Sequence, residues 1–103
     1  MNLKGTLPTL ILAVLEAGPS HGYAISKDLQ QRSNGQLDFG AGSLYPALHA
    51  QEKKGLITSF ETIEKGRTRR YYELTEDGRK TLAKEREEWQ RMTLVVGEIL
   101  GAT

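Results

Sequence analysis

The sequence predicts a mainly α fold of the α+β class, namely a winged helix-turn-helix of three helices and a two-stranded β-wing, followed by a long C-terminal helix. Three observations predict this fold. Apolar residues near the N-terminus recur at helical spacing, two strand-like runs flank a short basic segment, and the last quarter of the chain has an extended helical pattern. The 103 residues are enough for one domain. We expect residues 1–75 to form the winged part and residues 76–103 the C-terminal helix, packed together as one unit.

The first helix is expected over residues 6–17, because its apolar residues repeat on one face. They are Leu7, Leu10, Ile11, Val14 and Leu15. Gly18 and Pro19 then end the helix, and Ser20 is expected to cap a second one. Three glycines within residues 35–42 indicate a turn-rich connection to the third helix.

The third helix is expected to begin at Ser43, with Pro46 in its first turn, where a proline does little harm. Its apolar stripe consists of Leu44, Ala47 and Leu48. Gln51 continues this stripe as a polar residue, so we expect the helix to pack less tightly there. Gly55 supplies the end of the helix.

Two strand-like runs follow, at residues 56–63 and 69–74, and they predict a β-hairpin with a longer loop between them. Thr75 is expected to cap the last helix, which runs to about Leu100 over ~37 Å at ~1.5 Å per residue. Gly78 is expected to be a mild defect in its first turn.

The net charge of +1 does not by itself indicate a nucleic-acid partner, but the segment around the hairpin loop is strongly basic. Lys65, Arg67, Arg69 and Arg70 place four positive charges within six residues. Taken alone, such a run is as typical of a solubilising loop as of a binding site. Because the fold places this loop beside the third helix, we interpret it as a clamp for DNA phosphates, with Arg67 and Arg69 at the wing tip. Arg70 can instead point inward, since strand residues alternate sides.

The outward face of the third helix carries polar and aromatic side chains that suit the major groove of DNA. Ser43 can cap the helix and approach a phosphate, and Tyr45 can bond a phosphate or contact a thymine methyl group. Pro46 can contact the sugar-phosphate backbone, and His49 and Lys53 share this face. The alternative is that Tyr45 and Pro46 pack in the core.

The last helix has a short heptad pattern. Leu82, Trp89 and Val96 fall at one core position, and Glu85, Met92 and Ile99 at the other. We expect this helix to pack against the first helix and to bury its surplus apolar surface in a homodimer. Trp89 is an interface anchor in this interpretation; the alternative is that it stacks on a planar ligand at the dimer seam.

Other classes of function find little support. Cysteine is absent, which excludes disulfides and thiolate chemistry, and the N-terminal apolar stretch is too short to span a bilayer. Neither His21 nor His49 has partners for a catalytic triad, and zinc-binding and phosphate-loop motifs are missing. We therefore expect no enzyme, no cofactor, no metal and no membrane partner, and a location in the cytoplasm at the nucleoid.

The chain resembles the PadR family of bacterial transcription regulators. The resemblance rests on the ordered fragments LIL at 10–12, HGYAI at 21–25, GSLYPAL at 42–48, KGLI at 54–57 and RRYYELT at 69–75, followed by Gly78. It implies a homodimer, usually a repressor, bound to an inverted-repeat operator, in the compact branch with a single C-terminal dimerisation helix. It also implies DNA contacts by Tyr23, Ser43, Tyr45, Pro46 and the wing arginines, and in some compact members a flat aromatic ligand beside a tryptophan matching Trp89.

These observations predict a sequence-specific DNA-binding transcriptional regulator that a small aromatic effector can release. The alternative is a winged-helix module that binds a protein and has no DNA specificity of its own. The predicted DNA-binding residues are Tyr23, Ser43, Tyr45, Pro46, His49, Lys53, Lys65, Arg67 and Arg69. The predicted dimerisation residues are Leu82, Trp89, Met92, Val96 and Ile99.

Overall fold

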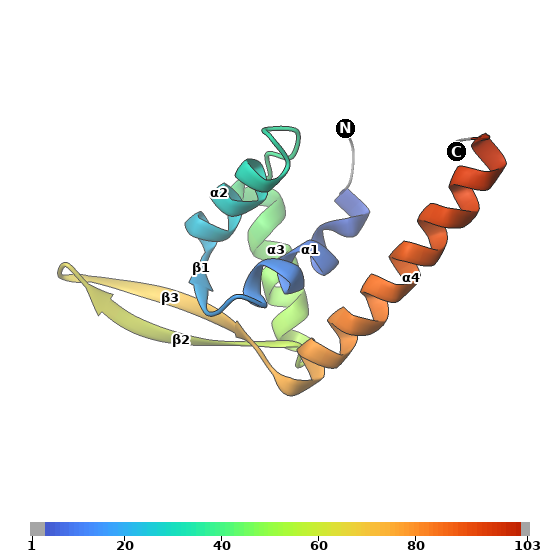
Figure 1. Cartoon of the computed structure of the whole chain (residues 1–103). Helices are drawn as coiled ribbons and strands as arrows, with labels where there is room; N and C mark the ends of the chain where they lie inside the picture. The colour runs from blue at the N-terminus through green and yellow to red at the C-terminus, as the bar shows by residue number, and fades with distance from the viewer. Residues whose placement is uncertain (1–3, 102–103) are drawn as a thin grey trace.

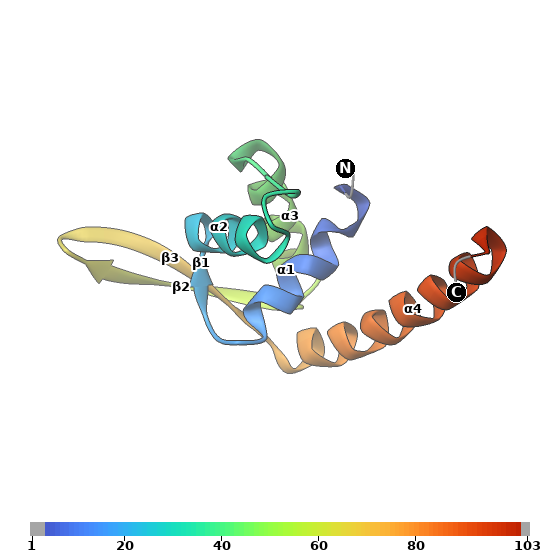
Figure 2. The ribbon, with the colours of Figure 1, turned by 45° about the horizontal axis from the view of Figure 1, so that its top comes forward.

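The computed structural model describes residues 4–101 and has the winged-helix architecture that the sequence predicts (Figure 1). Its elements are a 3₁₀ turn at Lys4–Thr6, α1 Leu7–Leu15, β1 Ser20–His21, α2 Gly22–Arg32, α3 Ala41–Lys53, β2 Ile57–Glu64, β3 Arg67–Leu74 and α4 Glu76–Leu100. The three short helices form a central body, and the β2–β3 wing and α4 extend from it in opposite directions (Figures 1 and 2). The molecule is accordingly elongated, measuring 55 × 29 × 21 Å.

The core is organised around α1, which is apolar on almost every side. Ile11 and Leu12 of this helix are fully buried, as are Ile25 of α2 and Leu48 of α3. Tyr72 of β3 closes the core on the side of the sheet. Each fully buried aliphatic side chain contributes about 1.5–3 kcal/mol, so this cluster accounts for much of the stability of the fold.

The start of α2 differs from the prediction that Ser20 caps it. Ser20 and His21 form a short strand that pairs with Tyr72 and Tyr71, so the sheet has three strands in the order β1-β3-β2. His21 is the actual cap, because its Nδ1 accepts a hydrogen bond from the Ala24 amide at 3.3 Å. A two-residue strand is too short to show a periodic sequence pattern. It is identified only by its pairing with β3.

The third helix begins two residues earlier than predicted. Gly40 occupies the capping position with an extended backbone, and its carbonyl accepts from the amides of Ser43 and Leu44. Ser43 therefore lies inside the first turn and is not the cap, which corrects its predicted structural role. Pro46 lies in the second turn, where it has no N–H to give to the carbonyl of Gly42. Of the three glycines that predicted a turn, Gly40 and Gly42 are at the beginning of the helix, whereas Gly35 lies in the turn after α2 with a positive φ angle.

Gln51 tightens the contact between α3 and α1, contrary to the expectation that it loosens it. Its side chain is buried, and its Nε2 donates a hydrogen bond to the carbonyl oxygen of Pro8 at 3.0 Å. The amide thus gives a partner to a carbonyl in the first turn of α1, which an apolar residue at this position cannot do.

The wing turn is shorter than the predicted loop. Strands β2 and β3 pair up to Glu64 and Arg67, leaving only Lys65 and Gly66 between them. Both turn residues have positive φ angles, 50° and 77°. A two-residue turn of this kind matches the twist of the strands it joins, so pairing continues through residues assigned to the loop.

Helix α4 begins where the sequence predicts, and its first turns are part of the core. The hydroxyl oxygen of Thr75 accepts from the Gly78 amide at 3.0 Å and its hydrogen is donated to the Gly55 carbonyl at 2.7 Å. Leu82 is only 2% exposed and packs in the core of its own chain, so its assignment to the dimer seam is wrong. Glu85, the other core position of this heptad, is half-buried and accepts a hydrogen bond from Thr9 of α1.

Two polar contacts hold α4 to α1 further along. The hydroxyl of Thr9 donates to Glu85 Oε1 at 2.9 Å. Arg86 forms a two-pronged ion pair with Glu16, at 2.9 and 3.3 Å, and its hydrogen bonds lower the pKa of the Glu16 carboxyl below its usual value. The expected packing of the last helix against the first is confirmed by these contacts.

Candidate nucleic-acid interface

The exposed face of α3 carries the side chains predicted to meet DNA. Pro46, His49 and Lys53 are exposed, and Tyr45 is 40% exposed. The opposite side of the helix is buried through Leu44 and Leu48. Neither Tyr45 nor Pro46 lies in the core, and the helix has the division between docked and open faces that a groove-reading helix needs.

Tyr45 packs closely against the backbone of a glycine in α2. A Cβ atom added at Gly22 would lie 2.5 Å from the Tyr45 hydroxyl oxygen and 2.8 Å from the ring carbon that carries it. The tyrosine ring therefore crosses the first turn of α2 at a distance that only glycine allows. The GY dipeptide at residues 22–23 thus serves both helices, because the next residue, Tyr23, is 62% exposed on the same surface.

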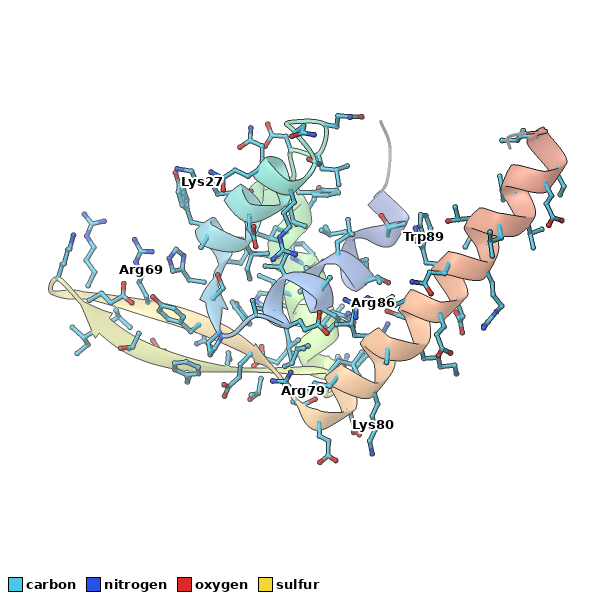
Figure 3. The ribbon with its side chains drawn as sticks, viewed as in Figure 1. Lys27, Arg69, Arg79, Lys80, Arg86 and Trp89 are labelled. Atoms are coloured by element: carbon cyan, nitrogen blue, oxygen red, sulfur yellow. The ribbon has the colours of Figure 1, made fainter. Side chains whose placement is uncertain are left out.

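Tyr23 is accompanied by a positive charge. Lys27, one turn further along α2, places its Nζ 5.8 Å from the centre of the Tyr23 ring (Figure 3). This distance suits a weak cation–π contact, which holds the ammonium group close to the aromatic face.

A groove of about 410 Å³ lies between α2, α3 and the wing. Its lining combines aromatic rings, hydroxyl groups, two imidazoles and two guanidinium groups. The lining residues are His21, Gly22, Tyr23, Tyr45, His49, Thr68, Arg69, Arg70 and Tyr72. Donors for phosphate oxygens and rings for sugars or bases therefore come together from three separate segments of the chain.

The basic residues of the wing fall into two groups. Lys65 and Arg67 are exposed at the tip, and within residues 4–101 the Arg67 side chain makes no hydrogen bond or ion pair. Arg70 lies on the same side of β3 as Tyr72, but its side chain is 52% exposed and does not point into the core; it donates to Ser59 Oγ at 3.0 Å. Its guanidinium is also 3.9 Å from Glu61. Arg67 is free to meet a phosphate, whereas Arg70 is already engaged by the wing.

Arg69 is placed differently from the prediction that it sits at the wing tip. It lies on the part of the wing beside α2 (Figure 3), and its Nη1 approaches His21 Nε2 at 2.6 Å and Nδ1 at 3.2 Å. Its Nε is 3.9 Å from Glu64, which also accepts a hydrogen bond from the Tyr71 hydroxyl. That bond raises the pKa of Tyr71.

The His21 ring is the centre of this small cluster. It meets the Tyr71 ring edge-on at 5.3 Å, and Tyr71 stacks on Phe60 at 5.7 Å. Burial, and then the positive charge of Arg69, lower the pKa of His21 below its usual value of about 6.5. The pairing of His21 with Arg69 could not be predicted from the sequence, because it depends on β1, a two-residue strand with no periodicity of its own.

A second cavity, of about 520 Å³, lies between α1 and α4. Leu10 and Ala13 line it from α1, and Trp89 and Met92 line it from α4. Trp89 lies on the side of α4 that faces α1 and is 49% exposed (Figure 3). Beyond it, Val96 and Ile99 are also exposed, so the predicted seam residues other than Leu82 are open in the single chain.

A recognition helix with an open polar face, a basic wing and a shared groove define the class of winged-helix DNA-binding proteins. The sequence model of the "Transcriptional regulator PadR-like family" matches residues 11–84. The chain belongs to this family, as the resemblance of its motifs predicts.

Individual relatives agree with the family. A transcriptional regulator from Clostridium thermocellum has a similar structure, with a TM-score of 0.86, 32% identity, and coverage of 93% of this chain and 91% of that one. PadR of Bacillus subtilis, solved with operator DNA, aligns with a TM-score of 0.69 and 26% identity over 76% of this chain and 45% of its own. A protein encoded in transposon TN4556 of Streptomyces fradiae is 43% identical over 84 residues; these are 82% of this chain but only 23% of that protein.

Among the described residues, none of the helices combines the length and the apolar character needed to cross a membrane. The same residues contain no group of three or more histidine, cysteine, aspartate or glutamate side chains placed to hold a metal ion.

Proposed function

We propose that this protein is a sequence-specific DNA-binding transcriptional regulator that acts in the cytoplasm as a homodimeric repressor on an inverted-repeat operator, with no catalytic activity. The observation that carries the proposal is the open face of α3, where Tyr45, Pro46 and His49 stand beside a basic wing. The operator complex of Bacillus subtilis PadR supports it, because that relative has the same fold.

In this proposal α3 enters the major groove and the wing follows the backbone. Tyr45, Pro46 and His49 meet base edges or sugars, and Ser43 in the first turn of α3 lies where the positive end of the helix favours a phosphate. Lys53, in the last turn of α3, contributes a positive charge on the same face. The remaining contacts come from Tyr23 of α2 and from Lys65 and Arg67 of the wing, which bind phosphates.

The dimer forms through residues 76–103, with residues 1–75 as the DNA-binding part; residues 1–3 and 102–103 of these ranges lie outside the described structure. Trp89, Met92, Val96 and Ile99 support this assignment, because they form an exposed apolar face on α4 that one chain leaves uncovered. A two-fold dimer brings two copies of α3 to the two halves of an inverted repeat.

Binding to the upstream region of its own gene tests the proposal. We expect Tyr45→Ala to weaken binding about tenfold, the effect of one good groove contact, and Arg67→Ala to lower the salt dependence of log K by about 0.9. Fluorescence anisotropy at several salt concentrations measures both quantities. Tyr45→Phe is the matched control, since it keeps the ring over Gly22 and loses only the hydroxyl.

A combined Tyr45→Ala and Arg67→Ala protein that binds as tightly as the wild type, with the same salt dependence, overturns the proposed surface. A wild-type protein with weak, salt-insensitive affinity for every duplex points instead to a protein-binding winged-helix module.

We also propose that a small planar aromatic compound binds beside Trp89 and releases the protein from DNA. The cavity between α1 and α4 supports this, because an indole ring and aliphatic side chains line it. Trp89 is the single tryptophan of the chain, so its fluorescence reports on this site alone.

We expect planar aromatic compounds to quench this fluorescence in the wild type, and Ala13→Leu, which fills part of the cavity, to reduce the quenching at least severalfold by removing space for the ring. Titration of a varied panel of compounds measures the effect. Equal fluorescence with and without every compound rejects an effector site here.

A further inference from the structure

We infer that His21 is a positioning residue: by accepting a hydrogen bond from Arg69, it holds the wing against the start of α2, and Arg69 thereby orients the wing instead of contacting a DNA phosphate. This inference rests on the proposed DNA-binding function and changes the role predicted for Arg69.

His21 contacts both the wing and the start of α2. Its backbone pairs with Tyr71 of β3, and its ring caps α2 through the Ala24 amide. The capping nitrogen, Nδ1, also lies 3.2 Å from Arg69 Nη1, and the ring packs edge-on against Tyr71. One residue thus touches the wing through its backbone, a hydrogen bond and a ring contact, and touches α2 as its cap.

The outer side of the wing reinforces this arrangement. Arg69, Tyr71 and Glu64 share one face of the β2–β3 hairpin, and Glu64 lies 3.9 Å from Arg69 while accepting from the Tyr71 hydroxyl. Arg69 is therefore held between an imidazole and a carboxylate, and its charge is already partly balanced. Arg67, two residues earlier on the same face, has no such partners in the described residues, which makes it the matched comparison.

The contact requires a neutral His21 ring. A neutral imidazole has one acceptor nitrogen, and a protonated ring has none. In the tautomer that caps α2 the acceptor is Nδ1, which the Ala24 amide approaches at 3.3 Å and Arg69 Nη1 at 3.2 Å. The groups that face the ring or share its groove are Arg69, Arg70 and Tyr71 of β3, Glu64 of β2, Tyr45 and His49 of α3, and Tyr23 of α2. Protonation places a second positive charge directly beside Arg69, with only Glu64 to offset it.

Acid is therefore expected to release the wing. Because burial and Arg69 lower the pKa of His21, the ring is neutral above its usual value of about 6.5, and the contact is complete there. As the pH falls through the lowered pKa, the contact is lost. Lys65 and Arg67 then no longer have a fixed place relative to Tyr23 and α3.

The test compares Arg69→Gln with Arg67→Gln in binding of a duplex from the protein's own upstream region, measured at several salt concentrations. We expect Arg67→Gln to lower the salt dependence of log K by about 0.9, because a phosphate contact is lost. Arg69→Gln should weaken binding about tenfold, the effect of one charged hydrogen bond, and leave the salt dependence as in the wild type.

His21→Asn separates positioning from folding, because asparagine caps a helix well but is too short to reach Arg69. We expect this substitution to lower the DNA affinity about as much as Arg69→Gln does. The double variant should bind DNA as tightly as either single variant. As the pH falls below about 6.5, the wild type should progressively lose affinity relative to His21→Asn. His49 is present in both proteins, so its contribution cancels.

Two results overturn the inference while leaving the proposed function in place: a loss of about 0.9 in salt dependence for Arg69→Gln, or fully additive effects of the two substitutions. If the wild type binds no duplex, the proposed function fails instead. NMR titration of the His21 ring then decides the inference, which requires Arg69→Gln to raise the pKa of His21; an unchanged pKa overturns it.

Discussion

Replacing Gly78 with alanine should destabilise the protein by about 3 kcal/mol, which lowers the melting temperature of a domain of this size by more than 10 °C, at about 4–8 °C per kcal/mol. A Cβ atom at this position would lie 2.0 Å from the carbonyl oxygen of Leu56 and 3.0 Å from a methyl group of Leu74. The Leu56 carbonyl also accepts from the Thr75 amide, so the backbone that must move is the one that anchors the start of α4. Gly78 is thus a requirement of the fold and not the mild helix defect that its sequence position indicates.

Gly42→Ala is the matched control for this prediction. Gly42 lies in the first turn of α3, as Gly78 lies in that of α4, and an added Cβ meets nothing within 4 Å. Thermal and urea unfolding of both variants should show Gly42→Ala equal to the wild type or up to about 1 kcal/mol more stable, because alanine favours a helix. Equal stability of Gly78→Ala and the wild type would contradict the close approach of α4 to Leu56.

Replacing Val96 with aspartate should dissociate the proposed dimer and weaken operator binding about a hundredfold or more, because two linked half-sites bind 10²–10⁴ times more tightly than one. In a two-fold dimer each substitution occurs twice, and an unpaired buried carboxylate costs several kcal/mol. Analytical ultracentrifugation at micromolar concentration measures the dimer, and anisotropy measures the DNA affinity.

Leu94→Asp makes the same chemical change on the other side of α4. Leu94 is 69% exposed and precedes Val96 by two residues, about half a turn around the helix. We expect this variant to remain dimeric and to bind DNA nearly as the wild type does. A monomeric wild type, or equal dissociation by both variants, would reject the predicted seam.

Local patterns predicted much of the fold. The helical spacing of apolar residues located α1, the capping threonine at 75 located the start of α4, and Gly55 marked the end of α3. The element boundaries that were predicted wrongly lie at glycines, because glycine occurs both in turns and at the ends of regular elements. Gly40 and Gly42 look like turn residues, but they begin a helix, and Gly66 makes a turn tight enough to extend both strands.

The candidate site was predictable to a similar degree. The outward face of α3 follows from its periodicity, because the residues opposite Leu44 and Leu48 must be open. The role of Arg69 could not be predicted in this way. Its charge predicted a phosphate contact, yet its partner is His21, 48 residues earlier, and no local pattern links the two.

The sequence by itself therefore determined the order of the elements, the open face of α3 and the basic character of the wing, since each depends on neighbours within a few residues. Tertiary structure alone decided that His21 belongs to the sheet, that Leu82 is buried in the core of its own chain, and that position 78 has no room for a side chain. The physical reason is that burial, close approach and the partner of a charge are properties of segments that meet only when the chain folds.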